Sequence, residues 1–186
     1  ESPCAVELVK PDGDKYAAWR VATTLPRVNG GPLEFGGFQA SDYDELIDCP
    51  VEMGTFVHAE FEAGGIPHEV ALTGVFEVDL ERLCSDLKII CEEHLERMGT
   101  PSDLDRYLFQ IMVVGNGYGG LEHRTSTSLI CKRDDLPREG EDKITDGYRT
   151  LLALSSHEYF HLWNVKRIKP DRFTPFDLSQ ESHTTL

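Results

Sequence analysis

The spacing of apolar residues along this chain predicts an alternation of strands and helices. A nearly continuous apolar run at 107–114 is typical of a strand at the centre of a sheet, buried on both faces. Apolar side chains recur at helical spacing over 80–98, and Gly99 then ends the predicted helix. Strand-like runs at 55–61 and 69–76 flank a glycine-containing linker, which favours a hairpin.

The other segments complete an α+β pattern. Residues 1–40 hold an extended run between turn sequences, which is too little for an independent β domain, so we interpret them as the end of one. A short helix is expected over 41–47 with Ser41 as its N-cap, and 121–130 should form one further strand. We therefore predict a β-domain remnant followed by a mixed sheet packed against helices in 41–186.

The last long apolar pattern, over 144–163, predicts a helix that carries two histidines. On a helical wheel most apolar side chains fall on one side, while His157 and His161 fall on another, with Glu158 between the two. A core-facing stripe beside a separate histidine face is what a buried active-site helix requires. The alternative is a packed helix whose two histidines make ordinary hydrogen bonds.

Residues 157–161 read H-E-x-x-H, a signature of zinc sites, and only about 0.03 accidental matches are expected from seven His and 18 Glu in this chain. Helix residues four apart lie one above the other, so His157 and His161 can bind one tetrahedral ion. Zinc lowers the pKa of a bound water toward about 7, and Glu158 can reach that water without being a ligand. Glu158 is therefore the natural general base.

Composition and charge narrow the function classes. The formal charge of −15 argues against a nucleic-acid partner, because DNA and RNA recognition depends on clustered Lys and Arg. The one basic cluster, at 166–172, follows the predicted helix and is interpreted as complementing its dipole. No apolar run reaches the roughly 18 residues that a membrane-spanning helix needs, so no membrane partner is expected.

The five cysteines are scattered and contain no C-x-x-C pair. We expect free thiols, which favours a reducing compartment such as the cytoplasm and leaves a periplasmic location open.

A second chemical element is the segment Gly119-Gly120-Leu121-Glu122-His123, upstream of the histidine helix. Glycines allow another backbone to approach closely, so Gly119 and Gly120 could begin an edge strand that pairs with an extended peptide. A carboxylate at Glu122 would then hold the free α-amine of that peptide, which would make the enzyme an exopeptidase. The alternative is a turn followed by an exposed strand.

Taken together, four segments resemble the M61 glycyl aminopeptidase family, which are gluzincin metallopeptidases with a thermolysin-like catalytic domain. They are the two motifs above, the continuation L-W-N-V-K-R-I-K-P at 162–170, and D-Y-D-E-L-I-D-C-P-V-E-M-G at 42–54. The resemblance covers about 35–186 and implies an aminopeptidase that releases small N-terminal residues such as Gly or Ala. It also implies a three-part plan of N-terminal β domain, catalytic domain and C-terminal PDZ-like domain.

The same resemblance assigns roles to the motif residues. It implies zinc on His157 and His161, Glu158 as general base, and Glu122 as the counterpart of the amine-binding glutamate in the G-x-M-E-N motif of related aminopeptidases. This sequence has His123 where those relatives have Asn.

The resemblance also implies a third zinc ligand, a glutamate in a W-x-x-E-G-type motif, and none occurs before Leu186. Glu181 is the only glutamate after His161, but its surroundings resemble the approach to the ligand helix, so the ligand is expected beyond Leu186. The chain is accordingly expected to be a fragment that lacks the rest of the catalytic domain and the PDZ-like domain, is inactive alone, and binds zinc partially or not at all.

Two other interpretations stay open. One is a non-catalytic peptide-binding module that recruits an extended segment at the edge from Gly119 to Ile130, with vestigial histidines. The other is a packing fragment that is inert without its missing parts.

Overall fold

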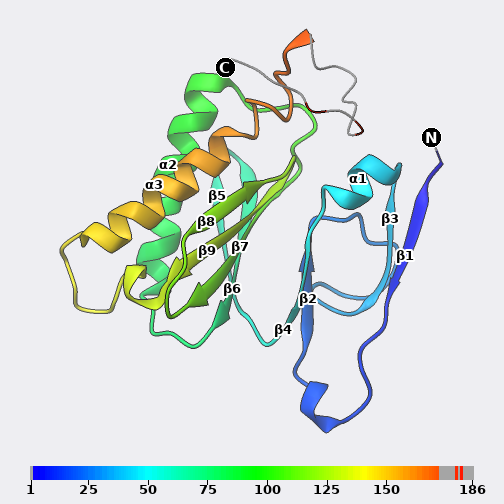
Figure 1. Cartoon of the computed structure of the whole chain (residues 1–186), viewed down its shortest axis with the longest axis horizontal. Coiled ribbons are helices and arrows are strands. Elements are labelled where there is room, and N and C mark those ends of the chain that lie inside the picture. The colour runs from blue at the N-terminus through cyan, green and yellow to red at the C-terminus, as the bar shows by residue number, and fades with distance from the viewer. Residues whose placement is uncertain (1, 172–178, 180, 182–186) are drawn as a thin grey trace.

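The computed structural model describes residues 2–171, 179 and 181, and its largest sheet has five strands (Figure 1). The long apolar strand β7 lies in the middle of this sheet with most of its side chains buried, as predicted. The outer pairs β5–β6 and β8–β9 are antiparallel, whereas β7 is parallel to both of its neighbours. In sheet order the strands are β5 (Val57–Ala63), β6 (Ile66–Gly74), β7 (Tyr107–Val114), β9 (Ser126–Lys132) and β8 (Gly119–Glu122).

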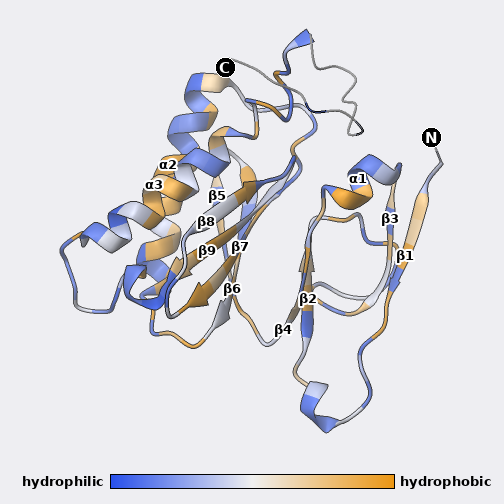
Figure 2. Cartoon of the chain, viewed as in Figure 1, coloured by the Kyte–Doolittle hydropathy of each residue, from blue (hydrophilic) through white to orange (hydrophobic). Residues whose placement is uncertain are grey.

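Two helices cover one face of the sheet, α2 (Leu80–Met98) and α3 (Asp146–Phe160). Leu83 and Leu87 of α2, Leu151 of α3, and Phe109 and Ile111 of β7 belong to one buried cluster, which is the main core. Both helices carry hydrophilic and hydrophobic residues in Figure 2, as expected of helices with a single buried face. The helix and the hairpin predicted in this part of the chain are confirmed; the hairpin turns tightly at Gly64 and Gly65, with φ of 57° and 80°.

The N-terminal part forms two small antiparallel sheets on the opposite face of the large sheet (Figure 1). It has its own buried cluster around Leu25 and Phe38, and a second cluster joins Ala22 to Ala71 and Leu108 of the large sheet. The molecule is therefore layered as helices, central sheet and small sheets. The pairs are β1 (Cys4–Leu8) with β3 (Gly36–Ala40), and β2 (Arg20–Thr23) with β4 (Val51–Gly54). A division into domains at residue 40 stays a prediction.

Local details differ from the sequence-based expectations. The segment 121–130 is not one strand but the end of β8, a turn and most of β9, because the amide of Arg124 donates to the Asp48 carboxylate instead of to a neighbouring strand. The edge proposed from Gly119 to Ile130 is thus limited to β8, since β9 lies between β7 and β8. Helix α1 (Tyr43–Ile47) is capped by Asp42, whose carboxylate accepts from the Glu45 amide, rather than by Ser41.

The basic cluster after α3 forms specific ion pairs instead of only complementing a helix dipole. Lys166 Nζ lies 2.8 Å from Asp48 Oδ1, and Arg167 Nε lies 2.9 Å from Asp103 Oδ1. Asp48 also accepts the Arg124 amide at 2.7 Å and lies 3.4 Å from His123 Nδ1. One carboxylate near the end of α1 therefore contacts the turn after β8 and the segment after α3.

The structure also describes the state of the cysteines and the apolar character of the helices. All five cysteines are free thiols. Within the described residues, no helix combines the length and the apolar character required to cross a bilayer.

Unfolding measurements at acidic pH should reveal how much the Asp48 carboxylate contributes to the stability of the fold. Burial by itself would raise the pKa of its carboxyl, but hydrogen bonds from His123, Lys166 and the Arg124 amide outweigh burial and lower the pKa from 3.8 to about 2. The stabilisation by Asp48 is therefore fully present above the pKa that its carboxyl has in the unfolded chain, and it is lost as the pH falls from about 4 toward 2. We expect Asp48→Asn to lower the free energy of unfolding at pH 7 by about 1–2 kcal/mol in urea titrations, and the two proteins to converge near pH 2.

The matched control is Asp12→Asn at an exposed turn, which should change stability by less than about 0.5 kcal/mol at any pH. A difference between Asp48→Asn and the unmodified protein that stays constant from pH 7 to pH 2 would contradict the assignment.

Candidate metal centre

The two motif histidines face each other at the end of α3. Their Nε2 atoms are 3.2 Å apart, and the rings meet edge to face. His161 is the C-cap residue, one position beyond the helix proper, but its φ of −64° and ψ of −14° keep the helical conformation. The four-residue spacing therefore still places both imidazoles on one side, as the sequence predicts.

The backbone after α3 determines which nitrogen of His161 can bind a metal. His161 Nδ1 lies 3.1 Å from the carbonyl oxygen of Asn164, an acceptor, so the imidazole proton resides on Nδ1. Nε2 is then left with its lone pair directed toward His157. A carbonyl that fixes the ring and its tautomer in this way is the usual outer partner of a metal-binding histidine.

Glu158 is almost completely buried beside the two histidines, against strand β8. A Cβ atom placed on Gly120 would lie 2.2 Å from Glu158 Oε1, so the carboxylate occupies the space that any other residue at 120 would fill. Burial raises the pKa of Glu158, while the charges of His157 and His161 oppose that shift. Gly119 differs from Gly120, since a Cβ there would meet nothing within 4 Å.

Glu122, the last residue of β8, lies beside Glu158 and His161. One ligating atom from each of Glu122, Glu158 and His161 lies within 4.8 Å of the other two. The structure therefore brings together the residues that the two sequence motifs single out, although the motifs are far apart in the chain. The outer edge of β8 pairs with no other strand among the described residues.

The donor set fits zinc. Two imidazole nitrogens with carboxylates beside them are ligands that zinc favours. The adjoining His123 is also buried, and its Nε2 has no hydrogen-bond partner in the part of the chain that the structure describes, which leaves an unsatisfied polar atom next to the site. Glu181, the less favoured candidate for the third ligand, is exposed and is not in the group formed by Glu122, Glu158 and His161.

Polar contacts on the buried side of α3 were missed from the sequence. The Tyr159 hydroxyl lies 2.9 Å from His68 Nε2, and His68 Nδ1 donates to the Ile66 carbonyl at 2.8 Å, so Nε2 must accept from Tyr159. His94 lies 2.9 Å from the Ser156 hydroxyl and stacks on Trp163. Tyr159 and Ser156 lie inside or next to the motif, but their partners come from α2 and β6, which no local pattern indicates.

Comparisons with known proteins find similarity to aminopeptidase families. A family model described as Peptidase M61 N-terminal domain matches residues 1–55, and one described as M61 glycyl aminopeptidase matches 150–186. The chain is similar to a crystal structure of an aminopeptidase N family protein from Idiomarina loihiensis, with a TM-score of 0.92 and 43% sequence identity. That similarity covers 98% of this chain and 31% of the other, so the chain spans about a third of the length of that relative. Comparison with curated proteins gave no match.

The contact between Tyr159 and His68 should contribute measurably to stability. Tyr159→Phe leaves the fully buried His68 Nε2 without its donor, which typically costs about 1–3 kcal/mol. We expect a decrease of that size in the free energy of unfolding by urea titration. Tyr118→Phe is the control, because the Tyr118 ring is exposed. This variant should lose less than about 0.5 kcal/mol of the free energy of unfolding. Equal losses in the two variants would show that the buried hydrogen bond is not stabilising.

Proposed function

Because the chain belongs to the M61 glycyl aminopeptidase family, we propose that the protein containing it is a zinc-dependent aminopeptidase with a thermolysin-like catalytic domain. It would release small N-terminal residues such as Gly or Ala. The observation that supports this most directly is the convergence of His157, His161, Glu158 and Glu122 at one end of α3. The activity, substrate and partners belong to the whole protein, of which this chain supplies the N-terminal domain and the start of the catalytic domain.

In this proposal His157 and His161 would hold zinc through Nε2, together with a third ligand. When bound, zinc supplies Lewis-acid activation of a carbonyl and of a water. Glu158 takes a proton from the attacking water and returns it to the leaving amine, which requires a carboxylate close to both histidines but pointing at the substrate. Its burial against Gly120 holds it in one orientation and keeps bulk water from its inner side.

Glu122 and β8 would bind the peptide. An extended substrate can add to the free edge of β8 through backbone hydrogen bonds, with Gly119 and Gly120 allowing its backbone to come close. Glu122, at the end of that strand, would pair with the α-ammonium group. Because Glu122 lies within 4.8 Å of His161 and Glu158, only a short segment fits between the amine and the reacting carbonyl, as removal of a single residue requires.

One observation favours a second candidate function. The free edge of β8 would serve equally well in a peptide-binding module without catalysis. That alternative predicts peptide affinity without zinc in the full-length protein, so elemental analysis separates it from the aminopeptidase. For the 186-residue chain alone we expect partial or absent zinc and no turnover.

Replacing the general base tests the mechanism. In the full-length protein, Glu158→Gln should lower kcat/KM on glycyl- and alanyl-amides by about 100-fold or more, while zinc content measured by mass spectrometry stays unchanged. A chelator should abolish the activity of the unmodified enzyme. Glu139→Gln, in an exposed loop, is the control and should retain activity. Chelator-resistant cleavage, or full activity in Glu158→Gln, would refute the proposal.

The close approach of Gly120 to Glu158 provides an independent test. Gly120→Ala adds a methyl group where the carboxylate now lies, so Glu158 must turn away. We expect kcat to fall by about tenfold or more, because a small displacement of a catalytic group has a large effect on rate. Gly115→Ala is the matched control, since the nearest atom to the Cβ added at residue 115 is 3.8 Å away. Equal activities of these two variants would show that residue 120 does not position Glu158.

A further inference from the structure

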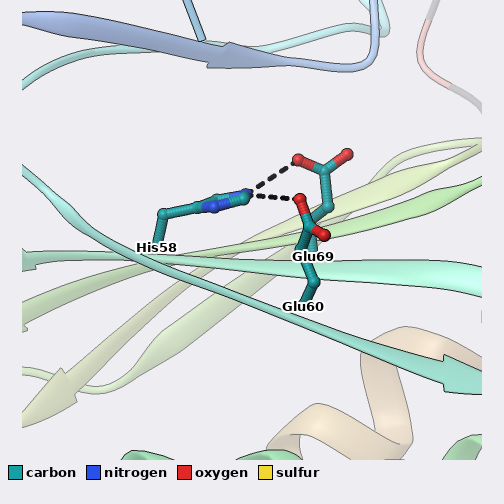
Figure 3. Close-up of side chains that lie close together, drawn as sticks. All are labelled: His58, Glu60 and Glu69. Carbon is teal, nitrogen blue, oxygen red and sulfur yellow. Dashed lines mark hydrogen bonds and ion pairs between the residues drawn. The ribbon is translucent and has the colours of Figure 1, made fainter. Parts of the chain in front are cut away.

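A second group of ligating side chains lies on the β5–β6 hairpin, away from α3. We propose that His58, Glu60 and Glu69 form a binding site for a divalent transition-metal cation such as Zn²⁺, distinct from the motif histidines. Their three side chains point toward one another in Figure 3. His58 Nε2 is 2.9 Å from Glu69 Oε2 and 4.0 Å from Glu60 Oε1, and all three ligating atoms lie within 4.8 Å of one another.

The strand register places like charges face to face. Glu60 and Glu69 are direct partners across the antiparallel pair, and His58 lies two residues earlier on the same face of β5. Carboxylates directly opposite each other destabilise a sheet, unless a cation lies between them. A cation held by both carboxylates and the imidazole would convert this repulsion into attraction.

The neighbours of Glu69 orient it as an ion ligand. Its Oε1 accepts a hydrogen bond from Arg106, 2.9 Å away, and Arg106 also donates to the Thr23 carbonyl at 2.7 Å. Oε2 is then directed toward His58. A ligating carboxylate that is held by an outer hydrogen bond in this way is typical of metal sites. Glu60 is 74% exposed and can turn toward an ion with little rearrangement of its surroundings.

The three side chains border a cavity of about 220 Å³ between the hairpin and the N-terminal segment, which leaves room for water to complete a coordination shell. Arg27 and Arg106 are among the other residues that line this cavity.

The chemistry selects the class of ion. One imidazole nitrogen with two carboxylates suits Zn²⁺, Co²⁺ or Mn²⁺ better than Ca²⁺, which prefers oxygen ligands alone. Binding exchanges the His58–Glu69 hydrogen bond for two bonds to the ion, and the imidazole proton then resides on Nδ1. Arg27 and Arg106 also line the cavity and repel cations, so binding depends on the two carboxylates and should not exceed one ion.

The competing explanation is an ordinary network in which His58, Glu69 and Arg106 only pair with one another. The two explanations differ at Glu60, which matters for ion binding but is dispensable for that network.

The experiment uses the full-length protein with His157→Gln and His161→Gln, which removes the motif histidines from the measurement. Calorimetric titration with ZnCl₂ should show that this background still binds one ion per chain. Adding Glu60→Gln should weaken that binding by about tenfold or more. Adding Glu62→Gln, an exposed glutamate two residues along the same strand, should change it by less than about twofold. No binding by the background, or equal binding after Glu60→Gln, would overturn the proposal.

A second measurement avoids the double substitution. The unmodified full-length protein, loaded with a single equivalent of Zn²⁺ so that the motif histidines are occupied first, is titrated with Co²⁺ while its visible absorbance is recorded. A saturable absorbance that is lost with Glu60→Gln and kept with Glu62→Gln supports the site. An absorbance that is indifferent to Glu60 contradicts it. Neither measurement depends on peptidase activity. Failure of this proposal can therefore be distinguished from failure of the proposed function.

Discussion

The close contact between β8 and α3 at Gly120 is the constraint on which the rest of the site depends. Because residue 120 has no side chain, the Glu158 carboxylate can lie directly against the backbone of the edge strand. The same contact brings Glu122, two residues later, to within 4.8 Å of His161. A larger residue would force the Glu158 side chain away from β8, and so would separate the proposed general base from the strand that carries Glu122, the proposed amine-binding carboxylate.

Helix α3 can present polar residues to the site because its other side is fixed to the core by polar as well as apolar contacts. Tyr159 donates to His68 of β6, and Ser156 meets His94 of α2. The Trp163 indole, just beyond the helix, donates to the Gly99 carbonyl at 2.9 Å. These bonds are directional, so they fix the rotation of the helix about its axis more strictly than apolar packing alone. That rotation decides where His157 and His161 point.

The parts that could be predicted from sequence are those set by local spacing. The pairing of His157 with His161 follows from helix geometry, the central position of β7 from its continuous apolar run, and the helix at 80–98 from its periodicity. The turn after Glu122 could not be predicted, because it depends on an acceptor, Asp48, that lies 76 residues away from Arg124.

The positions of two other groups were likewise set by partners distant in sequence. His94 faces Ser156, 62 residues further along, and Lys166 pairs with Asp48 across 118 residues. Neither pairing leaves a periodic pattern in the chain.

The ion pair between Lys166 and Asp48 also links two parts of the site. Asp48 contacts the backbone just after Glu122 and a side chain shortly after His161, so one carboxylate spans the two ends of the site. The N-terminal segment, which supplies no candidate metal-binding or catalytic residue, is thus linked through Asp48 to both chain segments that border the site.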